Sequence, residues 1–249
     1  LVSNGGVHSK DTHLLELVRI LTYRGLKVIV HAFTDGRDTL PKVALQTLLN
    51  FQNMLPENAF IGSVMGRFFS MDRDNRWERI AKAWETIVLG KAEYLSVNLS
   101  SLISEAYSRK ETDEFISPTI MHDKKGKVYK GINDGDGLIV GNFRSDRMQQ
   151  LLTSLVVKDF KEFNRTKLPN YGSIIGMVPY SSELSKRIPN LFPREIPKNT
   201  IGEVLSNFHI KQCRIAETEK FPHITFFLNG GEEKIFKGED RILIPSPKV

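Results

Sequence analysis

Three short loops combine arginine with aspartate, and each follows an apolar run that is typical of a buried β-strand. The loops are Asp35–Asp38 after Val28–Phe33, Gly66–Arg73 after Phe60–Met65, and Asn142–Arg147 after Leu138–Val140. An arginine guanidinium is always charged, and its planar set of donors matches the paired oxygens of a carboxylate or phosphate. Loops at the carboxyl ends of strands are where open α/β sheets bind ligands. The arginines of these loops therefore predict a site for a small, highly anionic substrate.

Simpler interpretations exist for parts of these loops. Asp35–Asp38 has the composition of an ordinary surface turn. The stretch 72–79 also fits the solvated start of a helix, where acidic residues lie near the positive end of the dipole. That interpretation suits Arg76 and Arg79, which can pair with acids along the helix. It suits Arg67 and Arg73 less well, because both precede the helix.

Residues that could hold a metal or act as nucleophiles are sparse. The six histidines contain no HExxH pair, and the single cysteine, Cys213, excludes a multi-thiolate zinc site and an internal disulfide. No serine or cysteine lies beside an obvious base. Residues 133–137 have the composition of a calcium loop, but Leu138 occupies a position that needs an oxygen ligand and Ser145 one that needs a bidentate Glu, so a turn is expected. We predict no catalytic and no metal-binding residue within this chain.

Helices and strands are expected to alternate along the first two thirds of the sequence. Apolar periodicity predicts helices over 11–25, from Pro41, over 77–89 and over 146–157, and strands over 28–33, 60–65, 138–140 and 173–178. In the helix over 77–89 we expect Trp77, Ile80, Ala81, Trp84 and Val88 to face inward. This order predicts an α/β fold with a mostly parallel sheet flanked by helices on both faces.

The last third of the sequence has a different character. Residues 186–198 contain three prolines and little periodicity, so they predict a linker between a domain over 1–185 and a second unit over 199–249. In the second unit, Thr200 and Glu203 have the spacing of a capping box, and strands are expected at 214–216 and 224–227. About 50 residues are few for a domain of this class, so we expect it to be incomplete.

Composition excludes some classes of protein. The chain has 249 residues and a net charge of +6, which permits binding of nucleic acid or of anionic substrates. Its acidic residues are interspersed with the basic ones, whereas a nucleic-acid binder usually shows a basic stripe with exposed aromatic residues. No apolar run approaches the length of a membrane helix. These features predict a cytoplasmic protein. Both ends of the sequence resemble interior sequence, so we interpret the chain as a fragment.

Five motifs occur in an order that resembles a known family. They are Asn4–Ser9, His31–Asp38, Met71–Arg79, Asn142–Arg147 and Glu217–Lys220. Together they closely resemble the cofactor-independent (2,3-bisphosphoglycerate-independent) phosphoglycerate mutases, along the whole chain. The resemblance implies an isomerase of glycolysis and gluconeogenesis that interconverts 3-phosphoglycerate and 2-phosphoglycerate through a phosphoserine. It also implies an inserted phosphotransferase domain, here residues 1–185, and an alkaline-phosphatase-like α/β domain with two divalent ions, usually Mn²⁺, represented here by an incomplete segment.

The resemblance assigns substrate-binding roles to particular residues. They are His8, Arg37, Asp38, Arg67, Arg73, Arg144, Arg147 and Lys220. The arginines would bind carboxylate and phosphate, Asp38 would contact the glycerate hydroxyl, and Lys220 would act from the phosphatase-like domain. The nucleophilic serine and the metal ligands of the family lie outside this sequence. Asn4 and Ser145 replace the Asp and Pro of many members.

Further expectations concern partners and alternatives. The expected partner is the small-molecule substrate, with no nucleic acid and no membrane, and the protein is expected to be a monomer. We predict that this chain alone, lacking the serine and the metal ligands, is inactive. A non-catalytic module that binds phosphosugar or phosphoglycerate remains an alternative, and a nucleic-acid binder is a third class that only the net charge favours.

Overall fold

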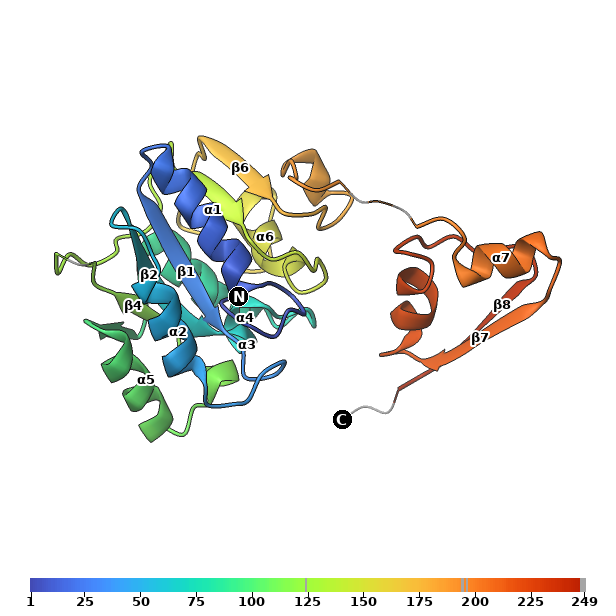
Figure 1. Ribbon diagram of the computed structural model, residues 1–249, viewed down its shortest axis with the longest axis horizontal. Helices are drawn as coiled ribbons and strands as arrows, with labels where there is room; N and C mark the ends of the chain where they lie inside the picture. The colour runs from blue at the N-terminus through green and yellow to red at the C-terminus, as the bar shows by residue number, and fades with distance from the viewer. Residues whose placement is uncertain (124, 194, 196, 247–249) are drawn as a thin grey trace. The chain divides into compact units, whose positions relative to one another are not determined.

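The computed structural model describes residues 1–123, 125–193, 195 and 197–246, and the chain folds as two compact units, Leu1–Pro193 and Arg194–Val249 (Figure 1). The boundary falls within residues 186–198, where a linker is expected. Among the described residues, no helix combines the length and the apolar character that crossing a bilayer requires.

The first unit contains most of the secondary structure. Its elements are α1 (Asp11–Tyr23), β1 (Val28–Thr34), α2 (Ala44–Asn53), β2 (Ala59–Gly66), α3 (Arg67–Ser70), α4 (Trp77–Trp84), η1 (Glu85–Leu89), β3 (Tyr94–Ser96), α5 (Leu99–Ser108), η2 (Asp113–Phe115), β4 (Thr119–Met121), β5 (Gly137–Val140), α6 (Gln149–Val156), β6 (Ser173–Gly176) and η3 (Leu184–Lys186). The alternation of helix and strand is thus present, as the apolar periodicity predicts.

The strands of this unit form a four-stranded sheet of order β1-β2-β4-β3 and a separate pair, β5-β6. Strands β1 and β2 are parallel, as are β3 with β4 and β5 with β6, while β2 and β4 are antiparallel. The fold is therefore α/β with mostly parallel pairing, but the sheet is mixed. Strands β5 and β6 do not extend the pairing of β1 and β2.

Two cores cover the two faces of the β1-β2 pair. Ala32 and Val64 point into a cluster with α1, α2 and α5, whereas the next residues along each strand, Phe33 and Met65, point into a cluster with α4 and α6. This alternation follows from the two-residue period of a strand. Both faces are buried, so the strands read as continuous apolar runs.

Several predicted boundaries differ from the structure. The helix expected from Pro41 begins at Ala44, and the helix expected from residue 146 begins at Gln149. The helix expected over 77–89 changes at Glu85 into the π-helix η1, and Ala83, rather than the predicted Ala81, is buried. Strands β3 and β4 are two of the four strands of the sheet. The sequence did not predict them because each has only three residues.

The second unit is small. Its elements are α7 (Ile201–Asn207), β7 (Gln212–Glu217), the π-helix η4 (His223–Phe227) and β8 (Glu239–Ile244), with β7 and β8 parallel. The prediction of a strand at 224–227 is wrong, because this short apolar run follows Pro222 and folds as η4. The capping box is not formed either. Glu203 accepts a hydrogen bond from the Asn199 amide at 2.7 Å, and no partner of the buried Thr200 hydroxyl occurs among the described residues.

Candidate functional site

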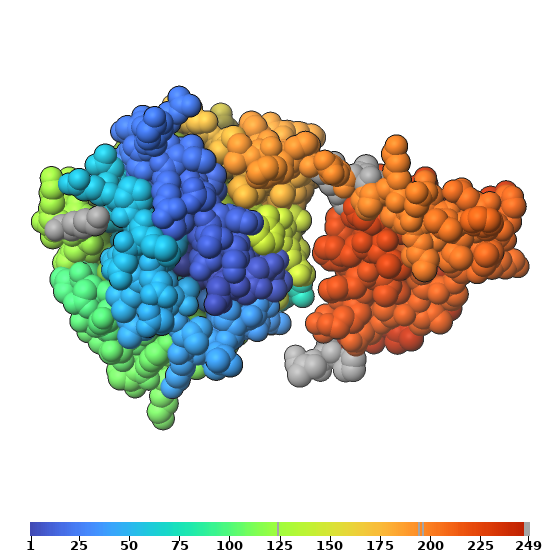
Figure 2. Space-filling view, in the orientation of Figure 1, coloured from blue at the N-terminus to red at the C-terminus, as the bar shows by residue number. Residues whose placement is uncertain are grey.

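The loops that follow β1, β2 and β5 belong to one cluster of charged side chains in the first unit. Strands β1 and β2 end level with each other, with Thr34 opposite Gly66, so the loop that carries Arg37 and the short helix α3, which begins at Arg67, start at the same edge of the sheet. The loop after β5 is joined to the N-terminal loop, because the His8 carbonyl accepts hydrogen bonds from the amides of Phe143 and Arg144 at 2.9 and 3.2 Å. Figure 2 shows the dark blue N-terminal surface beside the yellow-green surface of this distant segment.

Arg67 is enclosed by two aspartates of the preceding loop. Its Nη1 donates to Asp35 Oδ1 at 2.7 Å and to Asp38 Oδ2 at 2.5 Å, and its side chain is 3% exposed. Asp35 also accepts from the Ser3 hydroxyl at 2.6 Å and from the Asp38 amide at 3.0 Å. Burial alone raises the pKa of Asp35, but these hydrogen bonds and Arg67 outweigh burial and hold the pKa below its ordinary value. Arg67 therefore lies in a closed ion pair.

Asp146 joins the arginines of the other two loops. It accepts from Arg144 Nε at 3.0 Å and Nη2 at 3.2 Å, and from Arg73 Nη1 at 2.9 Å. All three side chains are between 20% and 31% exposed. Burial tends to raise the pKa of Asp146, yet Arg144, His8 and Arg73 keep the pKa below its usual range, so this carboxylate is charged.

Arg147 lies in a field of like charges. Its Nη1 donates to the Met71 carbonyl at 3.3 Å. Burial lowers the pKa of Arg147, and Arg73, Arg67 and Arg37 lower this pKa further. Among the described residues no carboxylate lies within 4.0 Å of its guanidinium. Because these like charges repel one another, an anion bound beside Arg147 is attracted by several arginines at once.

His8 connects the two groups of charged residues. Its ring is 3% exposed, with Nε2 3.9 Å from Asp38 Oδ2 and Nδ1 3.8 Å from Asp146 Oδ1. Burial, reinforced by Arg67, lowers the pKa of His8 to about 4. The imidazole is therefore neutral near pH 7 and can donate from one nitrogen and accept at the other. Its buried Nδ1 has no hydrogen-bond partner among the described residues.

The remaining predicted residues lie at the margin or elsewhere. Arg37 is 54% exposed, and its guanidinium lies 3.5 Å from Glu114 Oε1. Lys220 belongs to the second unit, where its exposed ammonium group pairs with Glu219 at 3.2 Å. That Lys220 acts on a ligand bound at the charged cluster of the first unit stays a prediction. Contacts within 4.0 Å, in part through Asp146, link His8, Asp38, Arg67, Arg73 and Arg144. Arg37 and Arg147 are related to this group through their charge, and Lys220 is described separately.

Two carboxylates that the sequence analysis did not select hold the loops in place. Asp72, 3% exposed, accepts from the amides of Asp74 and Arg76 at 2.9 Å and pairs with Arg79 at 3.3 Å. It fixes the loop of Arg73, and the guanidinium of Arg79 stacks 3.8 Å from the ring of Phe68. Arg79 thus pairs with an acid, as the simpler interpretation expects, but that acid is buried and precedes α4 instead of lying along the helix.

Asp113 performs a similar task for the loop after β1. Its Oδ2 accepts from the amides of Val43 and Ala44 at 2.7 and 2.8 Å, which caps α2 from 70 residues away in sequence. Its Oδ1 accepts from the Tyr107 hydroxyl at 2.5 Å. A Cβ at Gly36 would lie 2.6 Å from the Glu114 amide nitrogen, so only glycine permits this approach, and its φ of +69° also favours glycine. The segment after α5 therefore supports the loop of Arg37 and Asp38.

Sequence signals for the missed residues were weak but present. Asp146 lies two residues from Arg144, the spacing of a local guanidinium partner, whereas the guanidinium that Asp35 binds belongs to the distant Arg67 and not to Arg37. Asp113 carries no such signal, because its partners are distant in sequence. A groove of about 480 Å³ borders the cluster at Asp38 and is lined mainly by polar residues of the N-terminal loop and α2.

The residues present do not fit a metal centre. Within the described part of the chain, no three His, Cys, Asp or Glu side chains lie close enough together to hold a metal ion. The cluster is instead rich in guanidinium donors, which bind anions. Such an arrangement of donors can bind and orient an oxyanion.

Comparisons with known proteins identify relatives of the whole chain. The family model "BPG-independent PGAM N-terminus" matches residues 1–182. The 2,3-bisphosphoglycerate-independent phosphoglycerate mutase 1 of Methanosarcina acetivorans is 47% identical over 252 residues, covering 100% of this chain and 48% of that protein. The corresponding enzyme of Rhodopseudomonas palustris is 43% identical, with coverage of 100% and 48%. The chain spans about half the length of the curated relatives it matches.

A solved structure is similar as well. The phosphoglycerate mutase of Leishmania mexicana, crystallised at low cobalt concentration, superposes with a TM-score of 0.81 at 30% sequence identity, covering 100% of this chain and 47% of that one. The family model covers most of this chain, and the curated relatives cover all of it. The chain therefore belongs to the family of 2,3-bisphosphoglycerate-independent phosphoglycerate mutases.

Proposed function

We propose that the whole protein interconverts 3-phosphoglycerate and 2-phosphoglycerate, and that the first unit binds the substrate. The observation that carries the proposal is the meeting of Arg73, Arg144 and Arg147 with His8 and Asp38 in a chain of this family. The substrate has two anionic groups, a phosphate and a carboxylate. Several guanidinium groups in one place bind such a ligand through charge-assisted hydrogen bonds.

The arginines have different roles in this proposal. Arg147 attracts an anionic group because its own charge lacks a carboxylate partner among the described residues. Arg73 and Arg144 are partly exposed and present further donors. Arg67 is enclosed by Asp35 and Asp38, so it orients Asp38 toward a glycerate hydroxyl. This division of roles refines the sequence-based expectation that all arginines bind the ligand directly.

The neutral imidazole of His8 serves as a hydrogen-bond partner of the substrate. Its low pKa, about 4, keeps the ring uncharged, so it adds no further positive charge to the cluster. With a neutral ring, the site can select its ligand by hydrogen-bond geometry. The neutral ring of His8 can also accept a hydrogen bond from a hydroxyl of the substrate.

The remaining parts of the activity belong to the whole protein. The resemblance assigns phosphoryl transfer to a serine, and charge neutralisation to two divalent ions, expected to be Mn²⁺, whose ligands lie outside this sequence. Residues 199–249 contribute Lys220 from the phosphatase-like domain, and residues 186–198 act as the linker. We infer a cytoplasmic, monomeric enzyme of glycolysis and gluconeogenesis whose partner is its small-molecule substrate.

Kinetics of the full-length protein test the site. Arg73→Ala and Arg144→Ala should each lower turnover sharply, because each removes a charged contact to the substrate. Arg19→Ala is the matched control, since Arg19 is exposed on α1 and pairs only with Glu16 at 2.5 Å in the described structure. Turnover at the wild-type rate in both site variants would contradict the assignment.

Calorimetry on the 249-residue chain tests the division of labour. We expect this chain to bind 3-phosphoglycerate and to show no mutase activity with manganese. Turnover above a metal-free control would contradict the second expectation. Binding without turnover in the full-length protein would favour a non-catalytic phosphoglycerate-binding module instead.

A further inference from the structure

Asp146 lies where three parts of the arginine cluster meet. It contacts Arg144 of its own loop, Arg73 of the loop after β2, and the buried His8 of the N-terminal loop. One carboxylate therefore connects segments that are 73 and 138 residues away in sequence. The resemblance to the family does not single out this residue.

The contact between Asp146 and Arg144 has the geometry of an external oxyanion on arginine. The two carboxylate oxygens accept from Nε and Nη2 at 3.0 and 3.2 Å, and the second oxygen also accepts from Arg73 at 2.9 Å. Paired N–H donors facing paired oxygens is how arginine binds carboxylates and phosphates in general. Asp146 thus engages donors that the proposed function assigns to the substrate.

The surroundings of Asp146 differ from those of the closed ion pair around Arg67. The Arg67 side chain is 3% exposed, whereas those of Arg73 and Arg144 are 30% and 31% exposed. Long, partly exposed side chains reorient at little cost, and ion pairs between them are weak. The contacts of Asp146 are therefore exchangeable, while those of Arg67 are not.

A displaced Asp146 carboxylate has another partner within reach. His8 Nδ1 is buried and has no hydrogen-bond partner among the described residues, and it lies 3.8 Å from Asp146 Oδ1. A shift of roughly 1 Å brings the two atoms to hydrogen-bond distance, with His8 as the donor. The carboxylate can then leave the arginines without becoming unpaired.

We propose that Asp146 is an internal competitor of the substrate anion, which sets the affinity of the site. An incoming phosphate or carboxylate replaces Asp146 on Arg144 and Arg73, and Asp146 moves toward His8. This inference rests on the proposed function, because it takes phosphoglycerate as the ligand. Its consequence is a site that binds its ligand less tightly than its arginines would allow without Asp146, which favours release.

A purely positioning role for Asp146 predicts the opposite result. If Asp146 only holds Arg73 and Arg144 in place, its removal disorders both guanidinium groups and weakens binding. If Asp146 competes, its removal frees donors, raises the local charge by one, and strengthens binding. The sign of the change in affinity therefore separates the two roles.

The test compares Asp146→Asn with Asp74→Asn in the 249-residue chain. Asp74 is exposed and lies in the loop of Arg73, so its substitution changes the net charge equally without removing a contact to an arginine of the cluster. Calorimetry with 3-phosphoglycerate and with inorganic phosphate should show about fivefold tighter binding to Asp146→Asn, the size of one partly exposed ion pair. The Asp74→Asn variant should bind within twofold of the wild type. Unchanged or weaker binding to Asp146→Asn would overturn the proposal.

A second measurement needs no ligand. Modification by phenylglyoxal, located by mass spectrometry, should proceed several times faster at Arg73 and Arg144 in Asp146→Asn, with the exposed Arg19 of α1 unchanged. Asp146→Ser, which also removes the charge, provides a second variant if the first folds poorly by circular dichroism. Unchanged modification rates at Arg73 and Arg144 would overturn the proposal. If the wild type fails to bind phosphoglycerate while Asp146→Asn binds inorganic phosphate more tightly than the wild type does, the proposed function fails and the competition for arginine stands.

Discussion

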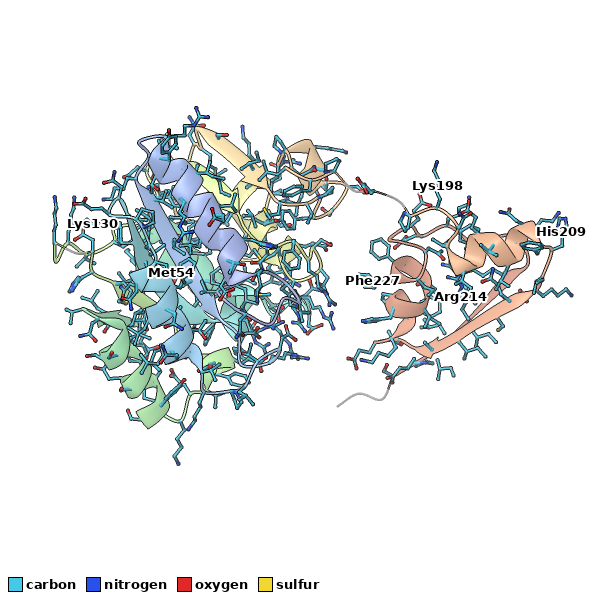
Figure 3. The ribbon with its side chains drawn as sticks, in the orientation of Figure 1. Met54, Lys130, Lys198, His209, Arg214 and Phe227 are labelled. Atoms are coloured by element: carbon cyan, nitrogen blue, oxygen red, sulfur yellow. The ribbon has the colours of Figure 1, made fainter. Side chains whose placement is uncertain are left out.

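Each unit contains an arginine whose pKa is lowered by burial, Arg147 in the first unit and Arg214 in the second, and the two have different surroundings. Arg214 of the second unit is 5% exposed, and Figure 3 labels it. Its guanidinium donates to the Ile224 carbonyl at 3.0 Å, to Asn229 Oδ1 at 2.8 Å and to Gln212 Oε1 at 3.1 Å, and it lies 3.3 Å from Glu239 Oε2. Its donors are thus directed at acceptors of the protein itself.

Arg147 of the first unit differs from Arg214 in the charges that surround its guanidinium. Burial lowers the pKa of both Arg147 and Arg214, but the next largest influence differs. For Arg147 it is the positive charge of Arg73, whereas for Arg214 it is the negative charge of Glu239, which raises the pKa. Complete local pairing indicates a structural arginine, and crowding by like charges indicates an arginine that binds an external anion. Arg67, paired with two aspartates inside the cluster, is structural by this criterion.

The largest expected effect is the loss of the structural pair. Arg214→Ala leaves Glu239, which is fully buried, with Arg241 as its remaining charged partner. We expect a loss of about 3 kcal/mol in the stability of the second unit, because a partly uncompensated buried charge is costly. Hydrogen exchange of the β7 and β8 amides should accelerate accordingly.

The matched control for Arg214→Ala is Lys237→Ala, at an exposed position of the same unit. It should change hydrogen exchange little. Phosphoglycerate binding should be unaltered in both variants. If Arg214→Ala instead weakened binding while leaving exchange unchanged, the distinction between structural and binding arginines would be wrong.

Arg147→Ala should produce the complementary result. We expect about 100-fold weaker binding of 3-phosphoglycerate, since two charge-assisted hydrogen bonds are lost. Stability should change by less than about 0.5 kcal/mol, because the substitution also relieves repulsion among the arginines. Calorimetry and urea unfolding measure the two quantities on the same sample. A strongly destabilised variant with normal affinity would place Arg147 with Arg214.

The fold could be predicted where the apolar pattern extended over many residues, and the prediction failed where the pattern was short. The apolar runs before Arg37 and Arg67 fixed the positions of β1 and β2 because both strands are buried on two faces. The three-residue strands β3 and β4 gave no periodic signal. The run 224–227 is apolar enough for a strand, but helix and strand cannot be distinguished over so few residues.

The site was predictable to the extent that its parts are local. Arg37, Arg67 and Arg73 follow β1 and β2, which end at the same edge of one sheet, whereas Arg144 and Arg147 follow β5 of a separate strand pair. The Asp146 contact to Arg144 is local, but its contacts to Arg73 and His8 depend on how the loops meet. The support from Asp113 spans 70 residues, so no short-range spacing reveals it. The sequence also could not separate the closed pair of Arg67 from the open position of Arg147.

A smaller loss of stability and affinity is expected for Asp113, which supports the loop of Arg37 and Asp38. Asp113→Ala removes the cap of α2 and leaves the Tyr107 hydroxyl without its partner, so we expect a loss of about 2 kcal/mol. The loop of Arg37 and Asp38 should loosen, and phosphoglycerate affinity should fall a few-fold. Asp113→Asn keeps an acceptor for the α2 amides and should recover most of both losses. Equal damage in the two variants would show that the charge of Asp113, rather than its hydrogen bonds, supports the site.

The smallest effect concerns pH and two histidines of the first unit. Burial lowers the pKa of both His8 and His31 to about 4, but His8 lies beside the arginines and His31 is hydrogen bonded to Ser63 at 2.8 Å within the sheet. The unfolded chain takes up a proton near pH 6.5 while the folded chain does not, so each histidine contributes stability above pH 6.5 that is lost as pH falls toward 4. Replacing His8 by Asn should reduce the stability difference between pH 7 and 5.5 by up to about 1 kcal/mol.

Titration of the two rings by NMR extends this test to the ligand. Saturating 3-phosphoglycerate should raise the pKa of His8, because the bound anion offsets the field of Arg67 at that ring. The pKa of His31 should stay unchanged, because burial alone lowers it. An equal rise at both histidines would indicate a general effect of added anion. A rise at His8 alone would show that the ligand binds beside the crowded arginines, which is the distinction that separates this region from the paired Arg214.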